Sequence, residues 1–132
     1  CSLHQLPLWP HSGEYFETGA GPGSGLTMNC PFPNGTGIDL YLETFEKVIS
    51  PKLEAFNPQL LLLSSGFDAH KEDPLADVRL ETADFYRITK WILQRAEEYT
   101  GGRVVSFLEG GYNLDALAES VTAHVQTLIE GP

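Results

Sequence analysis

Positive charge is scarce in this sequence. Only 8 lysines and arginines stand against 18 aspartates and glutamates, which gives a formal net charge of −10. Proteins bind nucleic acids and anionic membranes through basic patches, so neither is expected as a direct partner. A cationic partner would fit the acidic balance, but a solvated acidic surface is the simpler interpretation.

Cysteines and long apolar runs are also few. Cys1 and Cys30 lack zinc-finger spacing, so we expect no disulfide scaffold and a reducing compartment, cytoplasmic or nuclear. No apolar run approaches the roughly 20 residues of a membrane-spanning helix, and no signal peptide is visible. The sequence starts with Cys1 rather than Met, so we expect that it is truncated or was processed upstream.

The spacing of the apolar residues predicts an α/β fold. The length of 132 residues suits one domain that can bury a core. Residues 1–37, rich in glycine and proline, are predicted to form a long ordered loop with a short strand at 26–30. The following pattern predicts a helix over 37–58 that Pro51 kinks, and then a strand over 59–65 buried on both faces. After these it predicts a helix over 83–99 capped by Thr82 and stopped by Gly101, a strand over 103–111 that ends in glycines, and a helix over 114–131. Such an order predicts a parallel sheet sandwiched between helices.

The loops after two of these strands hold polar groups suited to chemistry. Ligands of open parallel sheets sit at the carboxyl ends of the strands, where "SSGFDAH" and "EGGYN" are found. Asp68 can bind a metal, act as a base or cap its loop, and His70 two residues later suits a metal site. Asp73, before Pro74, can simply start a turn. Tyr112 can donate a hydrogen bond to a developing oxyanion, or it can be a half-buried surface tyrosine.

Three longer stretches carry a family resemblance. "SSGFDAHKEDPLADVRLETADFYRIT" and "SFLEGGYNLDALAES" resemble the carboxyl-terminal part of zinc-dependent histone deacetylases of the class II and bacterial kind. "SLHQLPLWPHSGEYFETGAGPGSGLTMNCPFP" resembles the stretch that precedes this part in the same family. Each motif alone is weak, but all of them in the family's order are specific. The resemblance implies an arginase/deacetylase-like α/β fold, present here as a partial domain.

The resemblance also implies a reaction, the hydrolysis of an amide by a zinc ion that polarises the acetyl carbonyl and activates a water. It makes Asp68 a zinc ligand, His70 a loop residue rather than a ligand, and Tyr112 the stabiliser of the tetrahedral intermediate. The other implied positions are Trp9 for an aromatic wall of the acyl-lysine tunnel, Leu75 for its mouth, Gly110 and Gly111 for its floor, and Ser2 and Leu3 for a structural potassium ion.

The sequence also departs from the family pattern. His11 stands where the family usually has Gly. The family's two adjacent histidines and its Asp-x-His pair are absent, because the histidines here are His4, His11, His70 and His124. Since a catalytic zinc takes three protein ligands, this chain alone is expected to be inactive.

Two main hypotheses follow from the resemblance. Residues 1–132 form the carboxyl-terminal portion of one deacetylase catalytic domain, or they form a non-catalytic deacetylase-like binding or interaction module. A bland α/β domain in which Asp68 and Tyr112 are only structural is disfavoured by the co-occurrence of the motifs.

The expected substrate is acetylated lysine in a protein or an acetylated polyamine. Leu75 favours acyl-lysine, because a site that selects cationic polyamines is expected to have an acidic residue at the tunnel mouth. A partial sheet exposes apolar surface, so self-association, or association with the upstream half of the domain, is expected.

Overall fold

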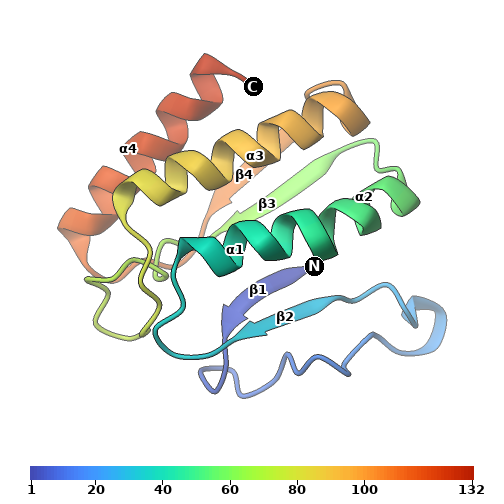
Figure 1. Ribbon diagram of the computed structural model, residues 1–132, viewed down its shortest axis with the longest axis horizontal. Helices are drawn as coiled ribbons and strands as arrows, with labels where there is room; N and C mark the ends of the chain where they lie inside the picture. Colours follow the sequence, from blue (N-terminus) through green and yellow to red (C-terminus); the bar gives the residue numbers. More distant parts are fainter.

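The computed structural model describes residues 1–132, in which four short parallel strands form two separate pairs (Figure 1). β1 (Ser2–Gln5) pairs with β2 (Asn29–Phe32), and β3 (Leu61–Ser65) pairs with β4 (Val104–Leu108). β1 lies between β2 and β3 in Figure 1, but no backbone pairing joins β1 to β3. The sheet is therefore interrupted at its centre.

The amino-terminal pair corrects the prediction for residues 1–37. The loop predicted there contains β1, which sequence reasoning missed, and the strand predicted at 26–30 lies instead at Asn29–Phe32. Pro31 lies within this strand, opposite His4. β2 pairs with β1 alone, and an edge strand tolerates a proline because one of its sides needs no backbone donors. A short 3₁₀ turn, η1 (Gly21–Gly23), is the only other element of the long connection.

The helix predicted over 37–58 is divided by a π-helical segment just before Pro51. α1 (Ile38–Thr44) runs into η2 (Phe45–Ile49), and α2 (Ser50–Phe56) continues it. Proline has no N–H to donate and its ring crowds the carbonyl four residues earlier, so the preceding turn widens. The backbone thus departs from α-helical geometry next to Pro51, and the kink itself stays a prediction.

The two longer helices have well-defined ends. α3 (Thr82–Thr100) is capped by Glu81, whose side chain and that of Asp84 form a reciprocal capping box, so the prediction that Thr82 is the cap is wrong by one residue. Gly101 ends α3 in a left-handed conformation, with φ of 61°, as predicted. α4 (Leu114–Glu130) begins where Asn113 accepts a hydrogen bond from the Ala116 amide at 3.1 Å.

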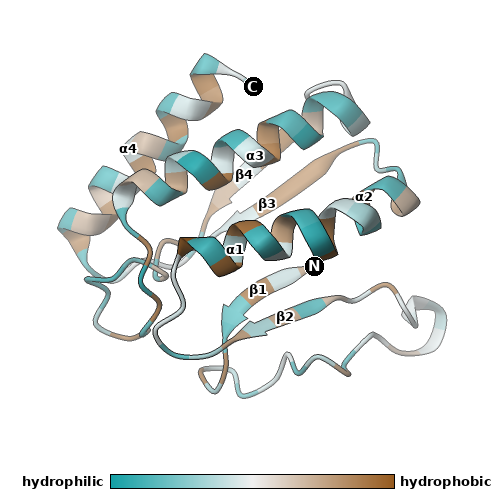
Figure 2. Cartoon of the chain, in the orientation of Figure 1, coloured by the Kyte–Doolittle hydropathy of each residue, from teal (hydrophilic) through white to brown (hydrophobic).

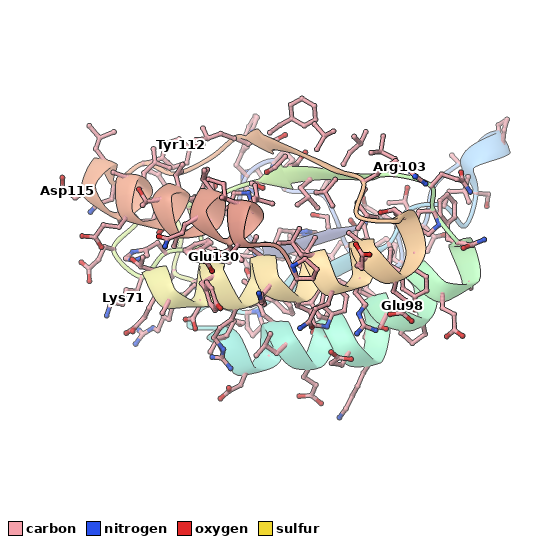
Figure 3. All side chains as sticks on the ribbon, turned by 90° about the horizontal axis from the view of Figure 1, so that it is seen from above. Lys71, Glu98, Arg103, Tyr112, Asp115 and Glu130 are labelled. Atoms are coloured by element: carbon pink, nitrogen blue, oxygen red, sulfur yellow. The ribbon has the colours of Figure 1, made fainter.

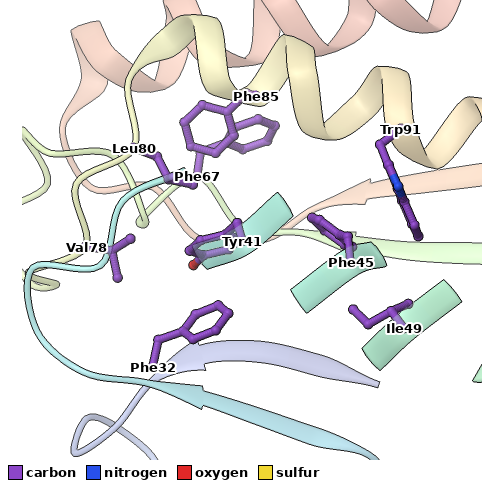
Figure 4. Packing of buried hydrophobic residues seen from close by; sticks show 9 residues of the cluster. All are labelled: Phe32, Tyr41, Phe45, Ile49, Phe67, Val78, Leu80, Phe85 and Trp91. Carbon is purple, nitrogen blue, oxygen red and sulfur yellow. The ribbon is translucent and has the colours of Figure 1, made fainter. Parts of the chain in front are cut away.

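One aromatic-rich core joins the two strand pairs (Figure 4). Phe45 stacks on Trp91 with ring centroids 4.7 Å apart, and Phe32 contacts Tyr41 at 4.6 Å. These contacts run from β2 through α1 and η2 to α3. The buried members are Phe32, Tyr41, Phe45, Ile49, Phe67, Val78, Leu80, Phe85 and Trp91.

The helices gather on one face of the strands, and the opposite face is bare (Figures 1 and 3). Leu62 on β3 is 65% exposed and Phe107 on β4 is 54% exposed. The prediction that the strand over 59–65 is buried on both faces is therefore wrong for this chain, and the apolar stretch of β3 in Figure 2 is covered on one side only. No helix of this chain is both long and apolar enough to cross a membrane.

Candidate active site at the carboxyl ends of β3 and β4

The loops after β3 and β4 run side by side because the parallel pairing continues beyond the strands. The Glu109 amide donates to the Ser65 carbonyl at 3.1 Å, and the Phe67 amide donates to the Gly110 carbonyl at 2.8 Å. These two bonds hold the residues that follow, Asp68 on one loop and Tyr112 on the other, at the same edge of the sheet.

The Asp68 carboxylate lies directly against two glycines. A methyl group built on Gly110 would lie 2.5 Å from Asp68 Oδ2, and one built on Gly66 would lie 2.9 Å from Oδ1. Both distances are too short for any side-chain carbon, so only glycine at these positions lets the carboxylate take its place. Gly110, predicted for a tunnel floor, thus contacts the predicted zinc ligand.

The surroundings of Asp68 disfavour its charged form. Burial raises the pKa of the Asp68 carboxyl above its ordinary value, and the negative charges of Asp73 and Glu109 raise this pKa further. Its only hydrogen-bond donor is its own backbone amide, which acts in the opposite direction. A carboxylate placed among acids without a cationic partner suits the binding of a cation.

The chain does not complete a metal site from its own residues. No three His, Cys, Asp or Glu side chains are grouped so that they could hold a metal ion. Catalytic zinc takes three protein ligands and a water, and a carboxylate oxygen is one of the donor types it accepts. Asp68 therefore fits zinc as one ligand, and the other ligands would have to come from residues outside this sequence.

His70 is an anchor of its own loop. The buried ring accepts a hydrogen bond from the Glu72 amide at Nδ1, 3.2 Å away, so Nε2 carries the proton and faces Thr82 Oγ1 at 3.4 Å. The ring also stacks on Phe85 with centroids 6.3 Å apart. The geometry thus supports the interpretation of His70 as a loop residue. It does not support the alternative that His70 is a metal ligand.

Tyr112 presents an exposed phenol on an anchored backbone. Its side chain is 55% exposed, and its amide donates to Asp73 Oδ2 at 2.8 Å. Gly111 before it has φ of 139°, and a methyl group there would lie 2.7 Å from Leu117 Cδ1, so this position requires glycine. Figure 3 labels Tyr112 near the end of β4, on the side away from α1 and α2.

Trp9 and Leu75 are both largely exposed, and their predicted places in a tunnel stay predictions. Leu75 is 62% exposed, and its amide donates to Asp73 Oδ1 at 2.9 Å, which ties it to the Tyr112 loop. Trp9 is 83% exposed and contacts the ring of His11, but it shares no hydrogen bond or ring contact with the loops after β3 and β4. His11 has φ of 62°, a left-handed conformation that favours glycine.

Ser2 and Leu3 lie on β1, apart from this group. They pair with Asn29 and Cys30 of β2, and the Ser2 hydroxyl lies 2.8 Å from His4 Nδ1. The structure therefore brings together Asp68, Leu75, Gly110, Gly111 and Tyr112, and leaves Trp9, Ser2 and Leu3 on other segments. The predicted potassium role of Ser2 and Leu3 stays a prediction.

Sequence reasoning missed the part played by Asp73. This side chain is 9% exposed, and its two oxygens accept from the amides of Leu75 and Tyr112. The Asp-Pro pair indicated only a turn, because the Tyr112 contact spans 39 residues.

Sequence reasoning also missed a buried polar chain beneath the site. Thr89 Oγ1 donates to the Phe85 carbonyl at 2.6 Å, so it must accept from His124 Nδ1, 2.7 Å away. His124 Nε2 then accepts from the Ser106 hydroxyl at 2.9 Å, and the Ser106 oxygen accepts from Ser65 at 2.8 Å. Burial lowers the pKa of the His124 imidazole. The position of His124 on the apolar stripe of its helix could have indicated that it is buried.

Comparisons with known proteins agree on one family. The model of the histone deacetylase domain matches residues 1–128. The chain is 43% identical to histone deacetylase 14, chloroplastic, of Arabidopsis thaliana over 97% of its own length and 30% of that protein. It is 40% identical to the histone deacetylase-like amidohydrolase of Pseudomonas aeruginosa over 85% of its length, again 30% of that protein. The chain thus spans less than a third of each of these two relatives.

A comparison of structures identifies the fold. The crystal structure of the HDA15 HD domain superposes with a TM-score of 0.88 and 32% identity, covering 98% of this chain and 36% of that domain's chain. The predicted α/β fold, present here as part of an arginase/deacetylase-like domain with parallel strands and helices, is confirmed.

Proposed function

The chain belongs to the histone deacetylase family, and we propose that it is the carboxyl-terminal portion of a zinc-dependent deacetylase catalytic domain. The reaction would be hydrolysis of the amide of acetyl-lysine in a protein or of a related acetylated amine. One observation carries the proposal: at the edge of the sheet Asp68, a carboxylate that no basic side chain pairs with, lies beside the loop that presents the exposed phenol of Tyr112.

Each residue of this edge has a role suited to its chemistry. Asp68 would be one ligand of the zinc, which when bound supplies a Lewis acid for the acyl carbonyl and an acidified water. Tyr112 would donate its phenolic hydrogen to the oxygen on which negative charge develops. Trp9 and Leu75, both exposed, would line the channel for the acyl-lysine stem, which is apolar along its methylene groups.

The other parts of the machinery would come from residues outside this sequence. The chain spans 30% of the Arabidopsis relative and contains one candidate zinc ligand, so alone it would not hydrolyse the amide. The bare apolar face of β3 and β4 supports packing against further parts of the domain or self-association. The expected location, cytoplasmic or nuclear, stays a prediction.

A second candidate is a deacetylase-like module that binds a partner without hydrolysing it. It is favoured by the lack of a complete ligand group within the 132 residues. The two candidates differ in zinc content and in turnover, both of which can be measured on the protein as its source organism makes it.

The deciding experiment compares Tyr112→Phe with the unmodified natural protein. We expect the rate of hydrolysis of an acetyl-lysine peptide to fall about 100- to 1,000-fold, because one donor to the oxyanion is lost. Zinc content, measured by metal analysis, should not change, because Tyr112 holds no metal.

A matched control is Tyr86→Phe, which removes a hydroxyl from a surface tyrosine of α3 and should keep the full rate. An unchanged rate in Tyr112→Phe would refute the assigned role of this residue. A natural protein that contains neither zinc nor deacetylase activity would favour the binding module.

A further inference from the structure

Asp73 is a buried carboxylate that has no basic partner. Its residue is 9% exposed, and none of the ion pairs of the structure includes it. Burying a charged group is costly unless hydrogen bonds replace its water. Backbone amides supply these bonds, which are of the strong, charge-assisted kind.

The two oxygens of Asp73 face two different segments. Oδ1 accepts from the Leu75 amide at 2.9 Å, with the Ala76 amide further away at 3.4 Å, and so fixes the turn that carries Leu75. Oδ2 accepts from the amide of Tyr112 at 2.8 Å. One planar group thus sets the position of the Tyr112 loop relative to the Leu75 turn.

The Tyr112 loop has few other means of holding its place. Gly110 and Gly111 precede Tyr112, the side chain is largely exposed, and its hydroxyl has no hydrogen-bond partner in the structure. Besides the bond from the Phe67 amide to the Gly110 carbonyl, the loops are joined by the bond from Asn113 Nδ2 to the Glu72 carbonyl at 3.1 Å. The bond from the Tyr112 amide to Asp73 is therefore the one that acts on the backbone of the tyrosine itself.

We propose that Asp73 is a positioning residue. It holds the backbone of Tyr112 at a fixed place relative to the Leu75 turn, so that the phenol reaches the reacting carbonyl. This inference rests on the proposed deacetylase function. Catalytic groups lose about 100-fold in rate when they are misplaced by roughly 1 Å, so an anchor on the backbone of Tyr112 contributes to turnover without touching the substrate.

Asp73→Asn is the substitution that tests this inference. The amide keeps the shape of the carboxylate but has one acceptor oxygen, so it cannot accept from both Leu75 and Tyr112. Asp77→Asn is the matched control, because it removes the same charge from the same loop at an exposed side chain whose one ionic contact, to Arg79, is 3.9 Å long.

In the natural protein we expect kcat for an acetyl-lysine peptide to fall about 10- to 100-fold in Asp73→Asn and to stay unchanged in Asp77→Asn. The effect should disappear in a Tyr112→Phe background, since Asp73 then has no phenol to position. A fall of the same size in both backgrounds would mean that Asp73 supports the fold without positioning Tyr112, and would overturn the inference.

Hydrogen exchange gives a readout that does not depend on activity. We expect the Tyr112 amide to exchange at least about tenfold faster in Asp73→Ala than in Asp77→Ala, because alanine leaves it without its buried acceptor. Equal exchange rates would overturn the inference. If the natural protein does not hydrolyse acetyl-lysine at all, the proposed function fails, and the exchange rates still decide whether Asp73 holds Tyr112.

Discussion

Replacing Gly110 by alanine tests the geometry of the site most directly. The added methyl carbon would lie 2.5 Å from Asp68 Oδ2 and 2.8 Å from its Cγ, whereas ordinary contacts begin at 3.4 Å. Either the carboxylate or the backbone must then move by about 0.9 Å to reach that separation. The backbone is held by the bond from the Phe67 amide to the Gly110 carbonyl, so we expect Asp68 to move.

The size of the effect follows from this displacement. A shift of nearly 1 Å in a group that binds the metal should lower the rate of acetyl-lysine hydrolysis by about 100-fold. Forcing a methyl group into filled space should also lower the free energy of unfolding by about 1–3 kcal/mol. The assays are initial rates with an acetyl-lysine peptide and urea unfolding, both on the natural protein.

Gly23→Ala serves as the control for this experiment. A methyl group there meets nothing within 4 Å, and the residue does not have a left-handed conformation. This variant should keep its rate and change the free energy of unfolding by less than about 1 kcal/mol. If Gly110→Ala behaved like Gly23→Ala in both assays, Asp68 would not lie against Gly110, and the description of the site would be refuted.

Two further predictions concern histidines. Burial holds the pKa of His124 below its ordinary value of about 6.5. As the pH falls below about 6.5, the unfolded protein therefore takes up a proton before the folded protein does. The free energy of unfolding should then drop by up to about 1.4 kcal/mol per pH unit, and it should be level above that range. Urea unfolding at pH 7.5 and 5.5 measures this drop, which should shrink in His124→Gln, and an equal drop in both proteins would contradict the assignment to His124. His11→Gly should raise the free energy of unfolding by up to about 1 kcal/mol, because the left-handed conformation with φ of 62° is strained for histidine. A clear fall in this free energy would contradict the prediction and show that the ring contact of His11 with Trp9 contributes more than the strain costs.

Strong local patterns made the helical part of the fold predictable from the sequence. The apolar stripe of α3 and the glycine that ends it are local signals, and so is the disturbance before Pro51. The capping residue was misassigned by one position because Glu81 and Thr82 are adjacent polar residues, and the reciprocal bond to Asp84 decided between them. β1 was missed because a four-residue strand with His and Gln carries almost no apolar signal.

Long-range contacts explain what the sequence could not provide. Four successive leucines indicated burial on both faces, but what covers a strand depends on other segments, and in this chain Leu62 is bare. Asp73 looked like a turn residue because its partner Tyr112 lies 39 positions away. The positions of Asp68 and Tyr112 at neighbouring strand ends followed from the predicted order of strands, whereas their assigned roles came from the family resemblance and stay predictions.

The hydrogen-bonded chain from Ser65 to the Phe85 carbonyl has a consequence for how α4 is seated. Its direction is fixed, because the carbonyl at one end can only accept, so each hydroxyl and the His124 ring have one arrangement that satisfies all of them. Apolar side chains tolerate small slides of a helix over a sheet, but these bonds do not. These hydrogen bonds therefore select a single register of α4 on β3 and β4. Apolar packing alone would allow several registers.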